Sequence, residues 1–186
     1  MSDAVSALEG RTSQGFATVQ EAGLQGMVSL RCDLASKALA KALKELGLSL
    51  PAQRRVVAAS GRSALWMSPD ELLILVPYAE AAATVAALEK ALVKEHALVV
   101  DVSDARAMFR VIGEKAEQVL TKLCPVDFDA LAADEVRRTR AAQVAAALWR
   151  SDKDTFSVVC FRSVAGYVMG ALEHSARPGS ELVAPA

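Results

Sequence analysis

Hydrophobic and polar positions along this chain alternate with two different periods, which predicts a mixture of strands and helices. Short apolar runs predict strands at residues 27–32, 55–59, 63–67, 72–76 and 98–102. Leu39, Leu43 and Leu46 fall on one stripe of a predicted helix over 34–46, and Gly47 is placed to end it. An alanine-rich segment at 78–94 predicts a second helix.

The same order of elements then begins again. Strands are predicted at 108–112, 137–144, 145–149 and 155–161, and helices at 114–123 and 163–174. Trp149 follows Trp66 by 83 residues, and at an offset of 81 Leu39 falls on Leu120. We therefore predict an α+β fold of two duplicated βαβββα-like halves, 27–102 and 103–176, packed as one domain over 27–176. Coincidence in a chain rich in Ala, Val and Leu is the alternative.

The two ends of the chain lack a clear period. Residues 1–26 scatter Gly and Ser among polar residues and are predicted to form an extended N-terminal arm, which could order on binding a partner. Residues 177–186 are predicted to form a flexible tail.

Composition narrows the class of protein. Of the 186 residues 53% are hydrophobic, and 21 Lys and Arg against 22 Asp and Glu leave a net charge of −1. This balance excludes disorder over most of the chain and nucleic-acid binding by bulk charge. We expect no membrane span, because no uncharged apolar stretch approaches about 18 residues. The absence of a signal peptide, and three cysteines without a C-x-x-C pair, predict a reduced, cytoplasmic protein.

The sequence predicts no catalytic, cofactor-binding or metal site. It has no dinucleotide, P-loop, zinc-protease or nucleophile-elbow motif. Asp101 and Asp104 could serve in acid–base chemistry or hold Mg²⁺, but carboxylates at a strand end more often form a turn. For Asp127 and Asp129 a solvated loop is likewise favoured.

A cluster of arginines is the best candidate for a docking contact. Arg137, Arg138 and Arg140 form the one dense basic group, and Arg138 and Arg140 would point the same way from a strand. Planar guanidinium groups suit recognition of carboxylates or phosphates. The alternative is a solvated strand face.

Several segments, taken in order, resemble a known family. They are the run from Leu120 to Phe128 containing Cys124-Pro125, the runs 138–150 and 154–163, the stretch Asp101-Val102-Ser103-Asp104, and Trp66 followed by Ser68-Pro69-Asp70-Glu71. Together they resemble the gamma subunit of bacterial heterotetrameric sarcosine oxidase, over about residues 27–175. That family is similar in fold to the folate-binding core of glycine-cleavage aminomethyltransferase.

The resemblance implies a non-catalytic structural subunit that binds no cofactor itself. Its implied partners are the alpha, beta and delta subunits, which carry FAD, FMN, NAD, tetrahydrofolate and zinc. The implied complex oxidatively demethylates sarcosine to glycine, with H2O2 and formaldehyde or 5,10-methylenetetrahydrofolate as the other products. A stand-alone folate-binding or one-carbon-transfer protein is the alternative. Part of the apolar content is then expected at permanent interfaces, which resemble a core cut in half.

Overall fold

The computed structural model describes residues 3–182, which divide into two compact units. One unit is Leu24–Asp104, and the other joins the described N-terminal residues up to Gly23 with those from Ala105 onward. The predicted halves, 27–102 and 103–176, differ from these units chiefly because the N-terminal residues belong with the later one.

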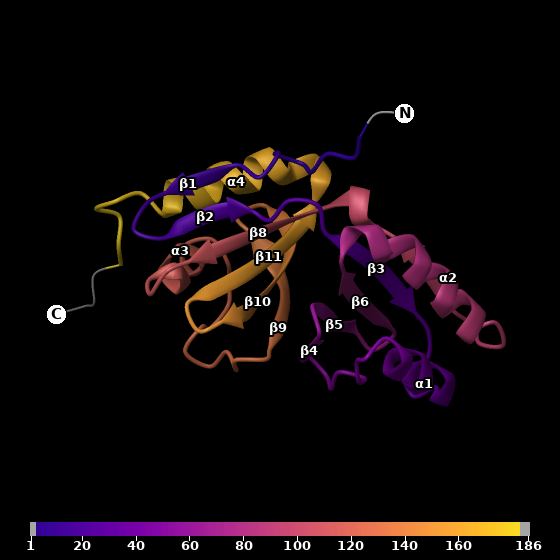
Figure 1. Ribbon diagram of the computed structural model, residues 1–186. Coiled ribbons are helices and arrows are strands. Elements are labelled where there is room, and N and C mark those ends of the chain that lie inside the picture. Colours follow the sequence, from indigo (N-terminus) through magenta and orange to yellow (C-terminus); the bar gives the residue numbers. More distant parts are fainter. Residues whose placement is uncertain (1–2, 183–186) are drawn as a thin grey trace. The chain divides into compact units, whose positions relative to one another are not determined.

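The Leu24–Asp104 unit is a five-stranded antiparallel sheet with two helices. Its elements are β3 (Gly26–Arg31), α1 (Lys37–Glu45), β4 (Val56–Ala59), β5 (Arg62–Ser68), β6 (Glu71–Val76), α2 (Ala81–Ala91) and β7 (Leu98–Asp101). The strands lie in the order β4-β5-β6-β3-β7. Both helices lie against the sheet in Figure 1, and their apolar stripes share one core with alternate strand residues. This core includes Val28, Leu30, Leu39, Leu43, Leu72, Ile74 and Leu88.

Local signals fix the ends of α1. The Ser36 hydroxyl accepts a hydrogen bond from the Leu39 backbone N–H at 3.3 Å, which caps the first turn. Gly47 has a φ of +76°, and the Leu48 N–H donates to the Leu43 carbonyl at 2.9 Å. The predicted glycine cap of this helix is therefore confirmed, because the left-handed conformation costs glycine little.

The second unit is built on a six-stranded sheet. Its elements are β1 (Thr12–Gln14), β2 (Thr18–Glu21), β8 (Arg106–Ile112), α3 (Ala116–Thr121), β9 (Val136–Ala141), β10 (Val144–Asp152), β11 (Thr155–Phe161) and α4 (Ala165–Ser175). The strand order is β1-β2-β8-β11-β10-β9. Its core contains Phe109, Val119, Leu120, Leu148, Phe156, Val158, Val168 and Leu172.

The predicted α+β duplication is confirmed. The order β3-α1-β4-β5-β6-α2 recurs as β8-α3-β9-β10-β11-α4. The tryptophan match is one residue out of register, however. Trp66 pairs with Leu72, the second residue of β6, whereas Arg150 pairs with Phe156, the second residue of β11. Trp66 therefore corresponds to Arg150, and Trp149 points to the opposite face, because a one-residue slip reverses the face of a strand.

The two ends of the chain are more ordered than predicted. β1 and β2 lie inside the segment expected to be an extended arm, and β2 pairs antiparallel with β8. Of the expected flexible tail, residues 177–182 are described, and they lie along α3. There the Leu182 N–H donates to the Gln118 side chain at 2.9 Å, and the Lys122 ammonium, just after α3, donates to the Ser180 hydroxyl oxygen at 3.1 Å. Residues 1–2 and 183–186 lie outside the described part of the chain.

Candidate functional site

The predicted arginine cluster lies on β9, an edge strand of its sheet, but its members do different things. Arg137 Nε lies 3.0 Å from Oε1 of Glu135, a residue that is only 6% exposed. Arg137 therefore neutralises a buried carboxylate within its own unit. This ion pair gives Arg137 a structural role within its own unit.

Arg138 and Arg140 are exposed and point to the other face of β9. They pair with Ala147 and Ala145 of β10, so two long cationic side chains stand beside two small ones. Alternation along the strand places both guanidinium groups on one face, as the sequence predicted. This pair is the exposed part of the cluster, and its guanidinium groups are of the kind that suits an anionic surface.

The aspartates raised as acid–base candidates act in turns and loops. Asp101 Oδ1 accepts hydrogen bonds from the Ser103 N–H at 2.9 Å and from its hydroxyl at 2.5 Å. Asp104 instead accepts from the Tyr78 hydroxyl at 3.1 Å. Asp127 accepts from the backbone N–H of Ala130 at 3.2 Å. The turn interpretation fits Asp101 and the loop interpretation fits Asp127, since each accepts a hydrogen bond from a backbone N–H two or three residues further along.

All three cysteines are buried free thiols. Burial raises the pKa of the Cys124 thiol from 9.0 to about 12, and that of Cys160 to about 11 although Arg106 acts in the opposite direction. Burial, followed by the charges of Asp33 and Glu95, also raises the pKa of Cys32. None of the thiols has the lowered pKa that nucleophilic cysteines require.

These thiols should make the fold sensitive to alkaline pH. Because their pKa values are higher in the folded than in the unfolded chain, the unfolded state loses its protons first as the pH rises. We expect the free energy of unfolding to fall from pH 9.0 towards pH 12, the range bounded by the ordinary and raised values for Cys124. Urea titrations at several pH values would measure this, and Cys124→Ala should flatten the curve. Rapid labelling of all three native thiols at pH 8 would contradict this account.

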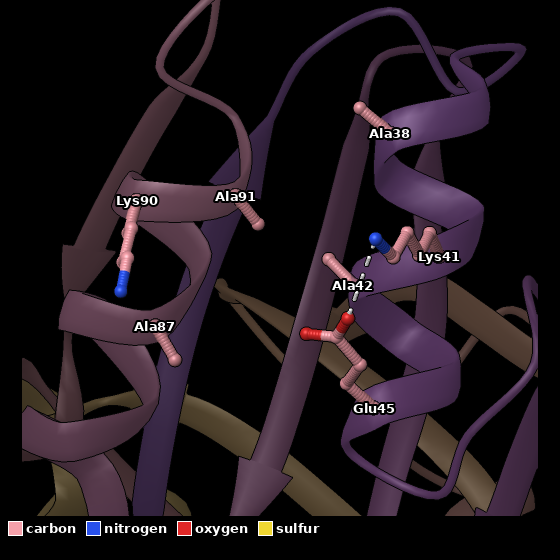
Figure 2. A pocket seen from close by; sticks show the side chains of 7 residues that line it. All are labelled: Ala38, Lys41, Ala42, Glu45, Ala87, Lys90 and Ala91. Atoms are coloured by element: carbon pink, nitrogen blue, oxygen red, sulfur yellow. Dashed lines mark ion pairs between the residues drawn. The ribbon is translucent and has the colours of Figure 1, made fainter.

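A shallow groove runs between the two helices of the Leu24–Asp104 unit. Figure 2 shows Ala38 and Ala42 of α1 facing Ala87 and Ala91 of α2 across it. The groove has a volume of about 570 Å³ and is open to solvent. Its charged residues are Lys41, Glu45 and Lys90, and the first two form an ion pair at 4.0 Å. The rest of the groove lining is alanine, which makes its surface flat and largely apolar between these charged side chains.

Two further structural observations concern metals and membranes. Among residues 3–182 no group of three or more His, Cys, Asp and Glu side chains is placed to hold a metal ion. Within the same range no helix has the length and apolar character needed to cross a membrane. The described surfaces that remain as candidates are places where another molecule could dock.

Known proteins that resemble this chain indicate which family it belongs to. The model of the sarcosine oxidase gamma subunit family matches residues 31–177. The chain belongs to this family. Two gamma subunits of sarcosine oxidase, from Corynebacterium sp. strain P-1 and from an Arthrobacter species, are each 31% identical over 152 residues. Each match covers 80% of this chain and 74% of the relative.

Solved structures agree with the family assignment. A chain of heterotetrameric sarcosine oxidase from Corynebacterium sp. U-96 matches with a TM-score of 0.80 and 26% identity, over 91% of this chain and 88% of that chain. The glycine-cleavage aminomethyltransferase T of Bartonella henselae matches with a TM-score of 0.66 at 15% identity, over 85% of this chain and 45% of that one. The second likeness concerns the fold alone, and it confirms the fold relationship predicted from the sequence.

Two features of these units were not predicted from the sequence. The first is the β1–β2 hairpin with its buried Glu21, and the second is the exposed sheet edge at β7. Strands of three or four residues with polar side chains, such as β1, leave almost no periodic signal. In β2 the structure buries Val19 and Glu21, but only Val19 is apolar, so the sequence shows no alternation there.

Proposed function

We propose that this chain is a non-catalytic structural subunit of a heterotetrameric sarcosine oxidase, held in place by alpha, beta and delta subunits. The family match over residues 31–177 carries the proposal. The chemistry of the described residues supports it: the thiols are buried and their pKa values are raised, and Asp101 and Asp127 accept hydrogen bonds from nearby backbone N–H groups.

In this proposal the other subunits carry FAD, FMN, NAD, tetrahydrofolate and zinc, and perform the oxidation. One sarcosine, one O2 and one water give glycine, formaldehyde and H2O2, and the two electrons removed from the methylamine group reduce O2. When tetrahydrofolate takes up the one-carbon unit, 5,10-methylenetetrahydrofolate replaces formaldehyde and the water is not consumed. This chain contributes no reacting group to either sequence.

Co-expression tests the proposal. The chain should co-purify with the alpha, beta and delta subunits as a stable assembly that produces H2O2 from sarcosine. The isolated chain should show no flavin absorbance and no such activity. Failure to co-purify would contradict the proposal. Micromolar binding of tetrahydrofolate to the isolated chain, measured by calorimetry, would instead favour the alternative of a stand-alone folate-binding protein.

The exposed arginines of β9 are proposed to contact an acidic surface of one of these subunits. Arg140→Glu should lower the assembly affinity by about tenfold or more, because like charges at an interface cost several kcal/mol. Pull-downs at low and moderate salt would measure the change, with Arg177→Glu as a control of the same charge change at another exposed position. Equal assembly of the variant, the control and the unmodified chain would exclude this contact.

A further inference from the structure

Strands β7 and β2 occupy equivalent places in the two units. The Val102 N–H donates to the Met27 carbonyl at 2.8 Å, and the Ala22 N–H donates to the Met108 carbonyl, also at 2.8 Å. Met27 and Met108 are the corresponding residues of β3 and β8, so each strand runs antiparallel along the same side of its partner.

The ends of the two strands also match. Asp101 stands opposite Val28, as Glu21 stands opposite Phe109. Each carboxylate accepts a hydrogen bond from the N–H two residues further along, at 2.9 Å for Asp101 and 3.2 Å for Glu21. The equivalence therefore extends from the backbone register to the side chain that ends each strand.

The outer edge is covered in one unit and open in the other. Beyond β2 lies β1, with Ser13 paired to Val19, and the Glu21 N–H donates to the Arg11 carbonyl at 2.8 Å. β7 is the last strand of its sheet. In an antiparallel ladder alternate residues turn their N–H and C=O groups to opposite sides, so those of Val99 and Asp101 point away from β3.

Two exposed side chains at this open edge are apolar. Leu98 is 56% exposed and Val100 39%, at the positions where β2 has Thr18 and Gln20. Soluble proteins protect exposed edge strands with charges, bulges or a covering segment, and an apolar edge left uncovered invites pairing with another chain. The exposed apolar residues of β7 therefore favour pairing of its outer edge with a strand of another chain.

A hollow flanks the same edge on the helix side of the sheet. It has a volume of about 280 Å³ and is lined by apolar residues that include Val93, Leu98 and Val99, with Glu89 and Glu95 as its charged residues. Val93 is 77% exposed. An apolar side chain fits this hollow, and the two carboxylates favour a neighbouring Lys or Arg.

We propose that the outer edge of β7 receives an extended segment of another subunit of the oxidase. The segment pairs antiparallel with Val99 and Asp101, as β1 pairs with β2, and carries apolar residues together with a Lys or Arg. This inference rests on the proposed function. A second copy of the chain is disfavoured, because a two-fold pairing of β7 strands would bring two identical acidic hollows to one interface.

Hydrogen exchange of the backbone amides tests the pairing directly. In the isolated chain the amides of Val99 and Asp101 should exchange rapidly, and in the purified heterotetramer they should slow by about a hundredfold or more. The amides of Leu98 and Val100 point towards β3, so they should be protected in both states and serve as internal controls.

A surface variant gives a second measurement. Val100→Lys should leave thermal unfolding of the isolated chain unchanged but weaken assembly by about tenfold or more, because it replaces an apolar side chain at the paired edge with a charge that the interface would have to desolvate. Leu50→Lys, at an exposed apolar position outside β7, is the matched control and should assemble normally.

The outcomes separate this inference from the proposed function. A heterotetramer that forms while Val99 and Asp101 still exchange rapidly would overturn the β7 contact and leave the proposed function standing. No heterotetramer at all would overturn both. A dimer of the isolated chain in which these amides are already protected would assign the edge to a second copy and overturn the inference.

Discussion

Replacing Gly15 with alanine should detach the β1–β2 hairpin from the end of α4 and lower the free energy of unfolding by about 3 kcal/mol. Gly15 lies in the turn between the two strands. A Cβ atom at this position would lie 1.9 Å from the Ala176 carbonyl oxygen and 2.8 Å from its carbonyl carbon. Both are backbone atoms, so no side-chain rotation can relieve the clash.

The clash also breaks a specific contact. The neighbouring Phe16 N–H donates to the same Ala176 carbonyl at 2.9 Å, so displacing Gly15 removes this hydrogen bond as well. In Figure 1 the hairpin lies beside α4, which is where the loss of contact should begin. Chemical denaturation would give the free energy, and hydrogen exchange would show whether β2 loses protection before the rest of its sheet.

Gly170→Ala provides a matched control. Gly170 lies on the exposed side of α4, and a Cβ atom there would meet nothing within 4 Å. Because glycine inside a helix is destabilising relative to alanine, this variant should raise the free energy of unfolding by about 0.5–1 kcal/mol. Equal effects of the two substitutions would contradict the steric account of Gly15.

The elements with strong local signals were predictable from the sequence. Helix α1 has an apolar stripe through Leu39 and Leu43, and a glycine at Gly47 that ends it. The β5–β6 hairpin carries two continuous apolar runs, 64–67 and 72–76, on either side of Pro69-Asp70. In these segments periodicity, turn chemistry and capping point to the same structure, which is why the predicted and observed bounds agree within three residues.

The place of the N-terminal residues in the fold could not be derived in the same way. β2 pairs with β8, and the two strands are about 90 residues apart in the chain. In each duplicated half one further strand pairs with the first strand of the repeat, which is β3 in the earlier half and β8 in the later half. In the earlier half this further strand is β7, from the residues after α2, whereas in the later half it is β2, from the beginning of the chain. Local propensity carries no information on such long-range pairing.

The candidate site was only partly predictable. The alternation of Arg138 and Arg140 follows from strand geometry, whereas the ion pair of Arg137 with Glu135 depends on the turn that precedes β9. Duplication itself was detectable because Leu39 and Leu120 keep an offset of 81, the same offset that relates Met27 to Met108. The comparison of β7 with β2 requires the pairing register, which only the structure supplies.

Glu21→Ala should lower the free energy of unfolding by about 2–3 kcal/mol, the second largest effect we expect. Glu21 is 1% exposed. Its Oε2 accepts hydrogen bonds from the Ser6 hydroxyl at 2.9 Å, the Gly10 N–H at 2.7 Å and the Gly23 N–H at 3.2 Å. Without this oxygen the N–H groups of Gly10, before β1, and of Gly23, after β2, lose the acceptor of a partly buried hydrogen bond. A buried donor left unpaired bears its full cost of desolvation.

Glu21→Gln and Asp101→Ala separate this hydrogen-bond network from a general effect of lost charge. The glutamine variant keeps one acceptor oxygen and should lose about half as much stability as the alanine variant. Asp101 holds the equivalent place on β7, but it is exposed and accepts its hydrogen bonds from one residue, Ser103. Its alanine variant should therefore lose only about 1 kcal/mol, since water replaces the missing acceptor. Equal losses for Glu21→Ala and Asp101→Ala in urea denaturation would show that burial at β2 is not what makes Glu21 important.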